Sequence, residues 1–314
     1  MSVPVVRPLA EADLPEADRI NRIAFGTFFG LADPSKFRGD GDVVHARWRA
    51  NPDGAFAVDL DGRLVACGFV MDWGSAGILG PLTVDVEFWS RGIARAAMEE
   101  MIAYMDRRGF ALQGLFTHPQ SAKHIRLYES FGFEMQRVTG VMEKSAPADA
   151  ILGNVLLFSG LTEPERDEAL AEAREVASAV FPGLDLTREI LSIAREGIGD
   201  TLLLRCGGRI GGFACCHQGA MSEAGSGQAL VKFASVVPGP EAAAAFATLV
   251  GACEGFAASR GVTRLVAGTN TGRSDCYRLM RELGFRTWMN GVAMFRRGGD
   301  GYNRAGIYAV DDWR

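Results

Sequence analysis

The sequence predicts an α/β protein made of two tandem copies of one unit. The first observation is that β-rich runs alternate with apolar residues at helical spacing. The second is a repeat, because Leu127–Phe133 (LYESFGF) returns as Leu279–Phe285 (LMRELGF), with Gly132 and Gly284 placed 152 positions apart. The third is the length of 314 residues, which suits two domains of roughly 150 residues each.

A second pattern supports the repeat. Asp61-Gly62-Arg63-Leu64 returns as Gly207-Gly208-Arg209-Ile210, and Gly62 and Gly208 lie 146 positions apart. The difference of six positions between the two offsets fits an insertion in the loop Ser222–Gly227. Between the copies, Ser145–Asn154 has the composition of a linker. We therefore divide the chain into a first domain, residues 1–146, and a second domain, residues 153–314.

The elements of the first copy follow from its apolar periodicity and its turn residues. Two β-rich runs within Gly54–Gly74 flank Asp61-Gly62, which is a strong signal for a β-hairpin. Arg108 and Gly109 suit the last turn and the end of a helix. In chain order we predict a helix over Leu14–Phe25, short helices and loop over Phe25–Trp48, the hairpin, a strand over Gly77–Val86, a helix from Ala94 to Met105, a strand over Phe110–Thr117, a helix over Ser121–Phe131 and a strand over Phe133–Lys144.

Composition argues against several classes of function. The net charge of −5 argues against a large basic face and therefore against a nucleic-acid partner. The first residues lack the features of a signal peptide, and the longest uncharged apolar run, near Ala242–Cys253, is shorter than the roughly 18 residues that span a membrane. The six cysteines and four histidines are scattered without C-x-x-C spacing. We expect buried thiols, no metal site, no membrane partner and a cytoplasmic location.

The stretch Phe88–Met98 (FWSRGIARAAM) starts a helix without the usual polar cap or acidic first turn, and no carboxylate lies between Glu87 and Glu99. Such a helix start exposes backbone N–H groups, and the helix dipole adds about half a positive charge there. Gly92 leaves the backbone open, and two arginines flank it. This pattern predicts a phosphate or pyrophosphate site. The alternative is an ordinary helix start with solvated arginines.

Two motifs in the first copy resemble those of one family. Leu82–Met98 (LTVDVEFWSRGIARAAM) is similar to the acyl-CoA pyrophosphate loop of the GNAT superfamily of N-acyltransferases, whose signature is R/Q-x-x-G-x-G/A after a strand. Ser121–Phe133 (SAKHIRLYESFGF) is similar to a later helix of that family, with a Tyr four residues before Gly-Phe. The resemblance covers roughly residues 3–144. Trp89 stands where the family usually has Arg or Gln, and Ser121 stands where Asn is common.

The resemblance implies two tandem domains, each with a mixed, mostly antiparallel sheet flanked by helices. It implies that acetyl-CoA, without a metal, lies where the strand Gly77–Val86 diverges from Phe110–Thr117. The Val84 N–H would polarise the thioester carbonyl, and Tyr128 would protonate the departing thiolate. The alternative for Tyr128 is a packed helix residue. The residues implied to bind acetyl-CoA are Leu82, Val84, Val86, Ser90, Arg91, Gly92, Ile93, Ala94, Arg95 and Ser121.

The group that deprotonates the amine has several candidates. Asp85 and Glu87 follow the diverging strand, and either carboxylate is placed to act through a water molecule. His118 and His124 are alternatives as bases, as structural residues or as contacts to the cofactor. The aromatic segment Ala305–Arg314 is a further alternative, because folding back would bring Asp311, Asp312 or the Arg314 carboxylate to the acceptor.

The second copy lacks the residues that the chemistry needs. At the offset of 152, Gly92 corresponds to Ala244, Ala94 to Phe246 and Tyr128 to Met280, and Pro238 replaces Val86. We expect a degenerate second domain that lines the acceptor cleft or an oligomer contact, which allows a homodimer, and one acetyl-CoA per chain. The predicted function is transfer of an acetyl group from acetyl-CoA to a primary amine, on a small molecule or a peptide, by direct attack. The alternatives are a non-catalytic acyl-CoA-binding or sensing module and an acyltransferase with a longer acyl donor.

Overall fold

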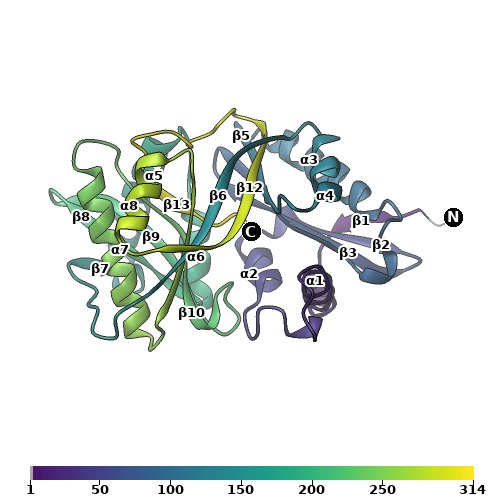
Figure 1. The fold of residues 1–314 in the computed structure, drawn as a ribbon, viewed down its shortest axis with the longest axis horizontal. Coiled ribbons are helices and arrows are strands. Elements are labelled where there is room, and N and C mark those ends of the chain that lie inside the picture. Colours follow the sequence, from purple (N-terminus) through teal and green to yellow (C-terminus); the bar gives the residue numbers. More distant parts are fainter. Residues whose placement is uncertain (1–2) are drawn as a thin grey trace.

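The computed structural model describes residues 3–314, and its strands form one 13-stranded sheet with helices on both faces (Figure 1). The strand order is β1-β2-β3-β4-β5-β12-β6-β11-β10-β9-β8-β7, and β13 pairs with β10. The strands are β1 (Val5–Pro8), β2 (Ala55–Leu60), β3 (Arg63–Trp73), β4 (Ala76–Val84), β5 (Leu112–Thr117), β6 (Glu134–Ser145), β7 (Val155–Leu157), β8 (Gly199–Cys206), β9 (Arg209–Gly219), β10 (Gly225–Val236), β11 (Arg264–Asn270), β12 (Arg286–Arg297) and β13 (Ala309–Asp311). The α-helices are α1 (Leu14–Phe28), α2 (Val43–Ala50), α3 (Ile93–Arg108), α4 (Ala122–Glu129), α5 (Glu163–Val180), α6 (Thr187–Glu196), α7 (Ala242–Ser259) and α8 (Ser274–Glu282).

The predicted elements of the first copy are confirmed, with small changes at their ends. The β2–β3 hairpin turns at Asp61 and Gly62, whose φ angles of 53° and 75° lie in the left-handed region that such turns use. Gly109 ends α3 with a φ of 68°. The helix predicted over Ser121–Phe131 stops at Glu129. Val86, predicted at the end of a strand, instead starts a 3₁₀ turn over Val86–Phe88.

The two copies exchange a strand at the centre of the sheet. β12, from the second copy, pairs with β5 of the first, while β6, from the first copy, pairs with β11 of the second. β6 and β12 also pair with each other in antiparallel fashion, and they lie side by side in the middle of Figure 1. Sequence periodicity does not reveal this exchange. It means that the two halves share one sheet and that neither β5 nor β11 has a free edge.

Helices cover both faces of the sheet in each half. In the first half α3 packs Met98 and Met101 against one face, while α1 and α2 pack Ile20 and Val44 against the other. In the second half α7 packs on the sheet in the same way. This helix is long and apolar enough to cross a membrane, but half of it is buried on the protein core. We therefore interpret α7 as a core helix, in agreement with the packed helix that the sequence predicts.

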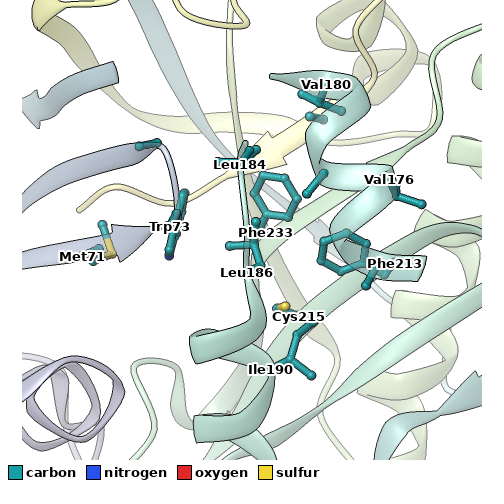
Figure 2. Packing of buried hydrophobic residues seen from close by; sticks show 14 of the residues in the cluster. Met71, Trp73, Val176, Val180, Leu184, Leu186, Ile190, Phe213, Cys215 and Phe233 are labelled. Carbon is teal, nitrogen blue, oxygen red and sulfur yellow. The ribbon is translucent and has the colours of Figure 1, made fainter. Parts of the chain in front are cut away.

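A further apolar cluster joins the halves. Figure 2 shows Trp73 of β3 pointing toward Phe233 of β10, with rings 5.7 Å apart in an edge-to-face arrangement. Leu184 and Leu186, which precede α6, lie beside them, and all four side chains are buried. Because these residues come from both halves, the cluster fixes one half against the other.

Buried charges lie beside this cluster. Glu223, predicted in a loop, is buried between Arg47 of α2 and Lys232 of β10, with its carboxylate 3.0 Å from the Lys232 Nζ. Glu189 pairs with His217 at 2.9 Å. Glu189, His217 and Glu223 offer ligand atoms within 4.8 Å of one another, as a metal site would. Because Arg47 and Lys232 already neutralise Glu223, the cluster is explained as an ion-pair network between the halves.

Candidate active site

A gap opens between β4 and β5. The two strands pair in parallel only from Ala76 and Leu112 to Leu79 and Leu115. Beyond Leu79, β4 continues to Val84 and pairs with β3 alone, with a register shift between Val70 and Gly68 of β3 that marks a bulge. The divergence predicted from the sequence is therefore present, and it leaves one edge of β4 without a strand partner.

The backbone of β4 aims hydrogen-bonding groups into this gap. The Asp85 N–H donates to the Val65 carbonyl of β3 at 2.8 Å. Because bonding alternates along an antiparallel strand, the N–H and C=O of Val84 point away from β3 and into the gap. The Val84 carbonyl accepts a hydrogen bond of 2.8 Å from the Trp89 indole. The Val84 N–H remains available to an oxygen in the gap.

An anion cradle follows β4. Ser90 and Gly92 have φ angles of 65° and 82°, which turns the backbone before α3. No side chain in the described residues caps this helix, and its first turn has no acidic residue. The Arg95 N–H bonds to the Gly92 carbonyl at 3.0 Å, whereas the N–H groups of Ile93 and Ala94 precede the first helical bonds. The backbone therefore presents donors and a positive dipole end to an anion.

The need for glycine at position 92 is conformational. A Cβ added there would meet no atom within 4 Å, so space alone does not require glycine. The left-handed φ of 82° does require it, because a side chain makes that conformation costly. The sequence predicts glycine at position 92 because an anion must approach the backbone. The structure shows a second reason, which is the left-handed turn at Gly92.

Cationic side chains surround the cradle. Arg91 stacks on Phe88 at 5.1 Å, and Arg95 donates to the Ser130 hydroxyl at 2.9 Å. Lys123, from the first turn of α4, donates to the Ser90 hydroxyl at 3.2 Å. Sequence reasoning missed Lys123. Its position two residues after Ser121, at a helix start facing the loop, was the signal that could have identified it.

Tyr128 lies on α4 at the first domain's core. Its ring packs on Phe133 with centroids 6.4 Å apart, and its hydroxyl bonds to no other described residue. Burial raises the pKa of Tyr128 to about 12. The phenol therefore keeps its proton at neutral pH and is free to donate it. Ser121, at the N-terminal end of the same helix, makes no capping hydrogen bond through its side chain.

The two carboxylates predicted as bases are held by arginines. Asp85 is buried and accepts hydrogen bonds from Arg19 at 2.6 Å and from Arg63 at 3.3 Å. Burial opposes ionisation of Asp85, but the Arg19 hydrogen bond and the Glu87 backbone N–H outweigh it and lower the pKa of the carboxyl. Glu87 is exposed and pairs with Arg63 at 3.2 Å. Both side chains thus face Arg63, and their role as bases stays a prediction.

Histidines and aromatic rings lie past the end of β5. His118 contacts the rings of Phe28, Phe29 and Phe116 at centroid distances of 5.1 to 5.6 Å. Burial, with smaller contributions from His124 and Arg314, lowers the pKa of His118 from its usual 6.5 to about 4. His118 is therefore uncharged at neutral pH and can accept a hydrogen bond from an amine.

A small pocket, with room for about one water molecule, lies beside this cluster. Its wall includes Phe116 of β5, Thr139 of β6, Ala293 of β12 and the segment Asp311–Arg314. Phe116 directly follows Leu115, the last residue of β5 that pairs with β4. The pocket therefore touches β5 next to the split, but no residue of β4 lines it.

Comparisons with known proteins identify the first half. Residues 18–133 match the model of the acetyltransferase (GNAT) family. These residues are therefore similar to a GNAT domain. The match contains the β4–β5 gap, the anion cradle and Tyr128, and it excludes the second copy. No curated protein sequence matches this chain.

Solved structures show that the fold extends over the whole chain. A putative acetyltransferase from Pyrococcus horikoshii is 14% identical and has a TM-score of 0.66, over 99% of this chain and 95% of the other. A GCN5-related N-acetyltransferase from Sphaerobacter thermophilus is 18% identical and has a TM-score of 0.59, over 96% and 98% of the two chains. The GNAT family that residues 18–133 match acts by acyl transfer with acetyl-CoA as co-substrate.

Proposed function

We propose that this protein transfers an acetyl group from acetyl-CoA to a primary amine by direct attack. The observation that supports it most is the open edge of β4 up to Val84, followed by the cradle at Ser90–Arg95. Lys123 of α4, the helix that carries Tyr128, bonds to this cradle. In this proposal the pantetheine pairs with Leu82 and Val84 of β4. The pyrophosphate lies on the N–H groups from Ser90 to Arg95, with Lys123 beside it.

The reaction needs one proton donor and one acceptor. The amine nitrogen attacks the thioester carbon, and the Val84 N–H stabilises the negative charge that develops on the carbonyl oxygen. The carbon–sulfur bond then breaks, and Tyr128 gives its proton to the thiolate. The proton lost by the nitrogen passes to His118 or water, and Tyr128 regains one from solvent. No net oxidation occurs.

In this proposal the acceptor amine approaches the gap from the side of Phe116 and His118. Uncharged His118 can accept a hydrogen bond from the amine, and the rings of Phe28 and Phe29 favour a substituent with an apolar part. A small-molecule or peptide amine fits this description. We place the reaction in the cytoplasm, where acetyl-CoA is made and where the six unpaired cysteines stay reduced.

An acceptor panel tests the proposal. Release of CoA from acetyl-CoA is measured with amino acids, polyamines, N-terminal peptides and amino sugars, and each product is identified by mass. Glucosamine belongs in the panel, because a fungal protein with a glucosamine N-acetyltransferase region has a TM-score of 0.62 at 12% identity over 94% of this chain and 38% of its own. Amine-dependent release with an acetylated product is expected. Binding of acetyl-CoA without any turnover would favour the sensing module instead.

A second assay addresses the acyl chain. Propionyl-CoA and longer acyl-CoAs replace acetyl-CoA with the best amine of the panel. We expect kcat/KM to fall as the chain lengthens, because the acyl group must fit between the Val84 N–H and the pocket wall at Phe116. A higher kcat/KM for a longer acyl-CoA would show that acetyl is not the natural group.

A further inference from the structure

The second copy has the same gap in its sheet as the first. β10 and β11 pair in parallel until Val231 and Ala267 and then diverge. Each of these residues lies 152 positions after its counterpart in the first copy, Leu79 or Leu115. The split therefore falls at equivalent positions in both halves.

The gap in the second copy is filled by the chain itself. β13 pairs with β10 directly after the split, with Asp311 opposite Phe233 and Ala309 opposite Ser235. On its other side the Ala309 carbonyl accepts hydrogen bonds of 3.3 Å from the Thr269 hydroxyl and the Cys276 thiol. A pantetheine in the first copy would use the equivalent backbone of β4. β13 thus replaces the cofactor with a piece of polypeptide.

An ion pair holds β13 in the gap. Asp311 accepts a hydrogen bond of 2.5 Å from Arg273 and another of 2.5 Å from the Tyr302 hydroxyl, and all three side chains are buried. Arg273 stands 152 positions after Ser121, at the position predicted to contact acetyl-CoA in the first copy. A Cβ on Gly268 would lie 2.9 Å from the Asp311 carbonyl, so the close approach needs glycine.

The residues after β13 cross from the second copy to the first. Trp313 packs on Phe295 at 5.6 Å and covers Gly114 of β5. The main-chain oxygen of Arg314 accepts a hydrogen bond of 2.6 Å from Arg47 of α2. The Arg47 guanidinium also packs on Gly80, the first residue of β4 after the split. Through Arg47, residues 312–314 therefore lie beside Gly80 of β4, and together with Phe116 they line the small pocket.

We propose that the segment Ala309–Arg314 closes the second cofactor gap and positions the acceptor amine for the first domain. The second copy holds this segment in place, and Asp312, Trp313 and Arg314 lie beside Phe116 on the side from which the amine reaches the gap. This inference rests on the proposed acetyl transfer. The roles are distinct: the first copy binds acetyl-CoA, and the segment acts only on the amine.

A short deletion tests the positioning role. A variant lacking Asp312, Trp313 and Arg314 keeps β13 and its Arg273 pair. We expect kcat/KM for the best amine to fall at least tenfold, mainly through KM. Acetyl-CoA affinity and the slow hydrolysis of acetyl-CoA without amine should stay within twofold of wild type. Tyr308→Phe is the matched control, because Tyr308 precedes β13 and lies outside the pocket wall. Unchanged kcat/KM in the deletion would overturn the positioning role.

Two further measurements keep the proposal testable if the deletion unfolds or if no amine reacts. Trp313→Leu removes the indole and should raise the KM for the amine at least fivefold. The kcat/KM for hydrolysis of acetyl-CoA without amine should stay unchanged. An unchanged KM for the amine counts against the proposal.

Hydrogen exchange of the backbone amides can be measured without turnover. Acetyl-CoA should slow exchange at Leu82–Val84 and leave Phe233–Ser235 as protected as before. Slower exchange at Phe233–Ser235 after addition of acetyl-CoA would show that the cofactor displaces β13 and binds in the second gap.

Discussion

Tyr128 shows how far a single residue can be understood from sequence. The motif Leu127–Phe133 predicts a tyrosine on an inward-facing helix, and the structure adds a partly buried ring whose hydroxyl bonds to no other described residue. Other residues were less predictable. Asp85 follows the diverging strand in sequence, but its ion pair with Arg19, which is distant along the chain, could not be predicted. Trp89 donates to Val84, a contact that depends on the turn between them.

Tyr128→Phe tests the proton donor. Removing the hydroxyl should lower kcat about 100-fold and leave acetyl-CoA affinity nearly unchanged, because the lost proton transfer serves the transition state. Steady-state kinetics and calorimetry measure the two quantities. Since burial raises the pKa of Tyr128 to about 12, its ionisation should not lower the wild-type rate below pH 10. Equal kcat in both proteins would make Tyr128 a packing residue.

Gly92→Glu tests the anion cradle. The new carboxylate should repel the pyrophosphate and lower acetyl-CoA affinity at least tenfold, about 1.4 kcal/mol or more. The left-handed φ of 82° penalises any side chain, so Gly92→Ala is the control for backbone strain alone. Calorimetry should find a clearly weaker affinity for the glutamate variant than for the alanine variant. Equal affinities would place the pyrophosphate elsewhere.

His118→Phe tests the environment of the buried imidazole. The unfolded chain binds a proton near pH 6.5, whereas folding lowers the pKa of His118 to about 4. The unfolded state therefore holds more protons between these values, and the imidazole makes the wild type lose stability as pH falls from 6.5 to 4. Between pH 6.5 and 4, the free energy of unfolding of the variant should fall by about 2 kcal/mol less than that of the wild type, as measured by denaturant titrations. Parallel pH profiles would mean that His118 titrates normally.

At the scale of elements, most of the first copy follows from its own sequence. The hairpin, the diverging strand, the cradle and the helix of Tyr128 were predictable because local turn residues and apolar spacing specify them. The partners of β6 and β12 were not. Their patterns fit a strand beside β5 equally well in either copy, and only the assembled sheet shows that β12 takes that place. The role of β13 was equally hidden, because a three-residue strand has no periodicity to detect.

The strand exchange predicts that the halves depend on each other. Residues 1–146 alone would leave β5 without β12 and β6 without β11. We expect this fragment to aggregate or to melt well below the intact chain, and to form a 1:1 complex when it is expressed together with residues 153–314. Size-exclusion chromatography and thermal melting measure both outcomes. A soluble fragment 1–146 with the melting temperature of the whole protein would contradict this dependence.

At the scale of the whole molecule, one fold occurs twice, with its gap open in the first copy and filled in the second. The first copy leaves its gap open and provides donors, cations and a phenol around it. In the second copy Phe246 and Met280 are buried core residues and β13 fills the equivalent gap. The sequence predicted a degenerate second copy from these substitutions. Only the structure shows that β13, a strand of the same chain, fills the gap between β10 and β11.

Titration calorimetry with acetyl-CoA tests this account most directly. If the first copy alone binds the cofactor, the full-length protein takes up one acetyl-CoA per chain. Gly92→Glu should weaken that single binding event without revealing a second. Two equivalent sites per chain, or a site of unchanged affinity in Gly92→Glu, would contradict the assignment of the cofactor to the gap between β4 and β5.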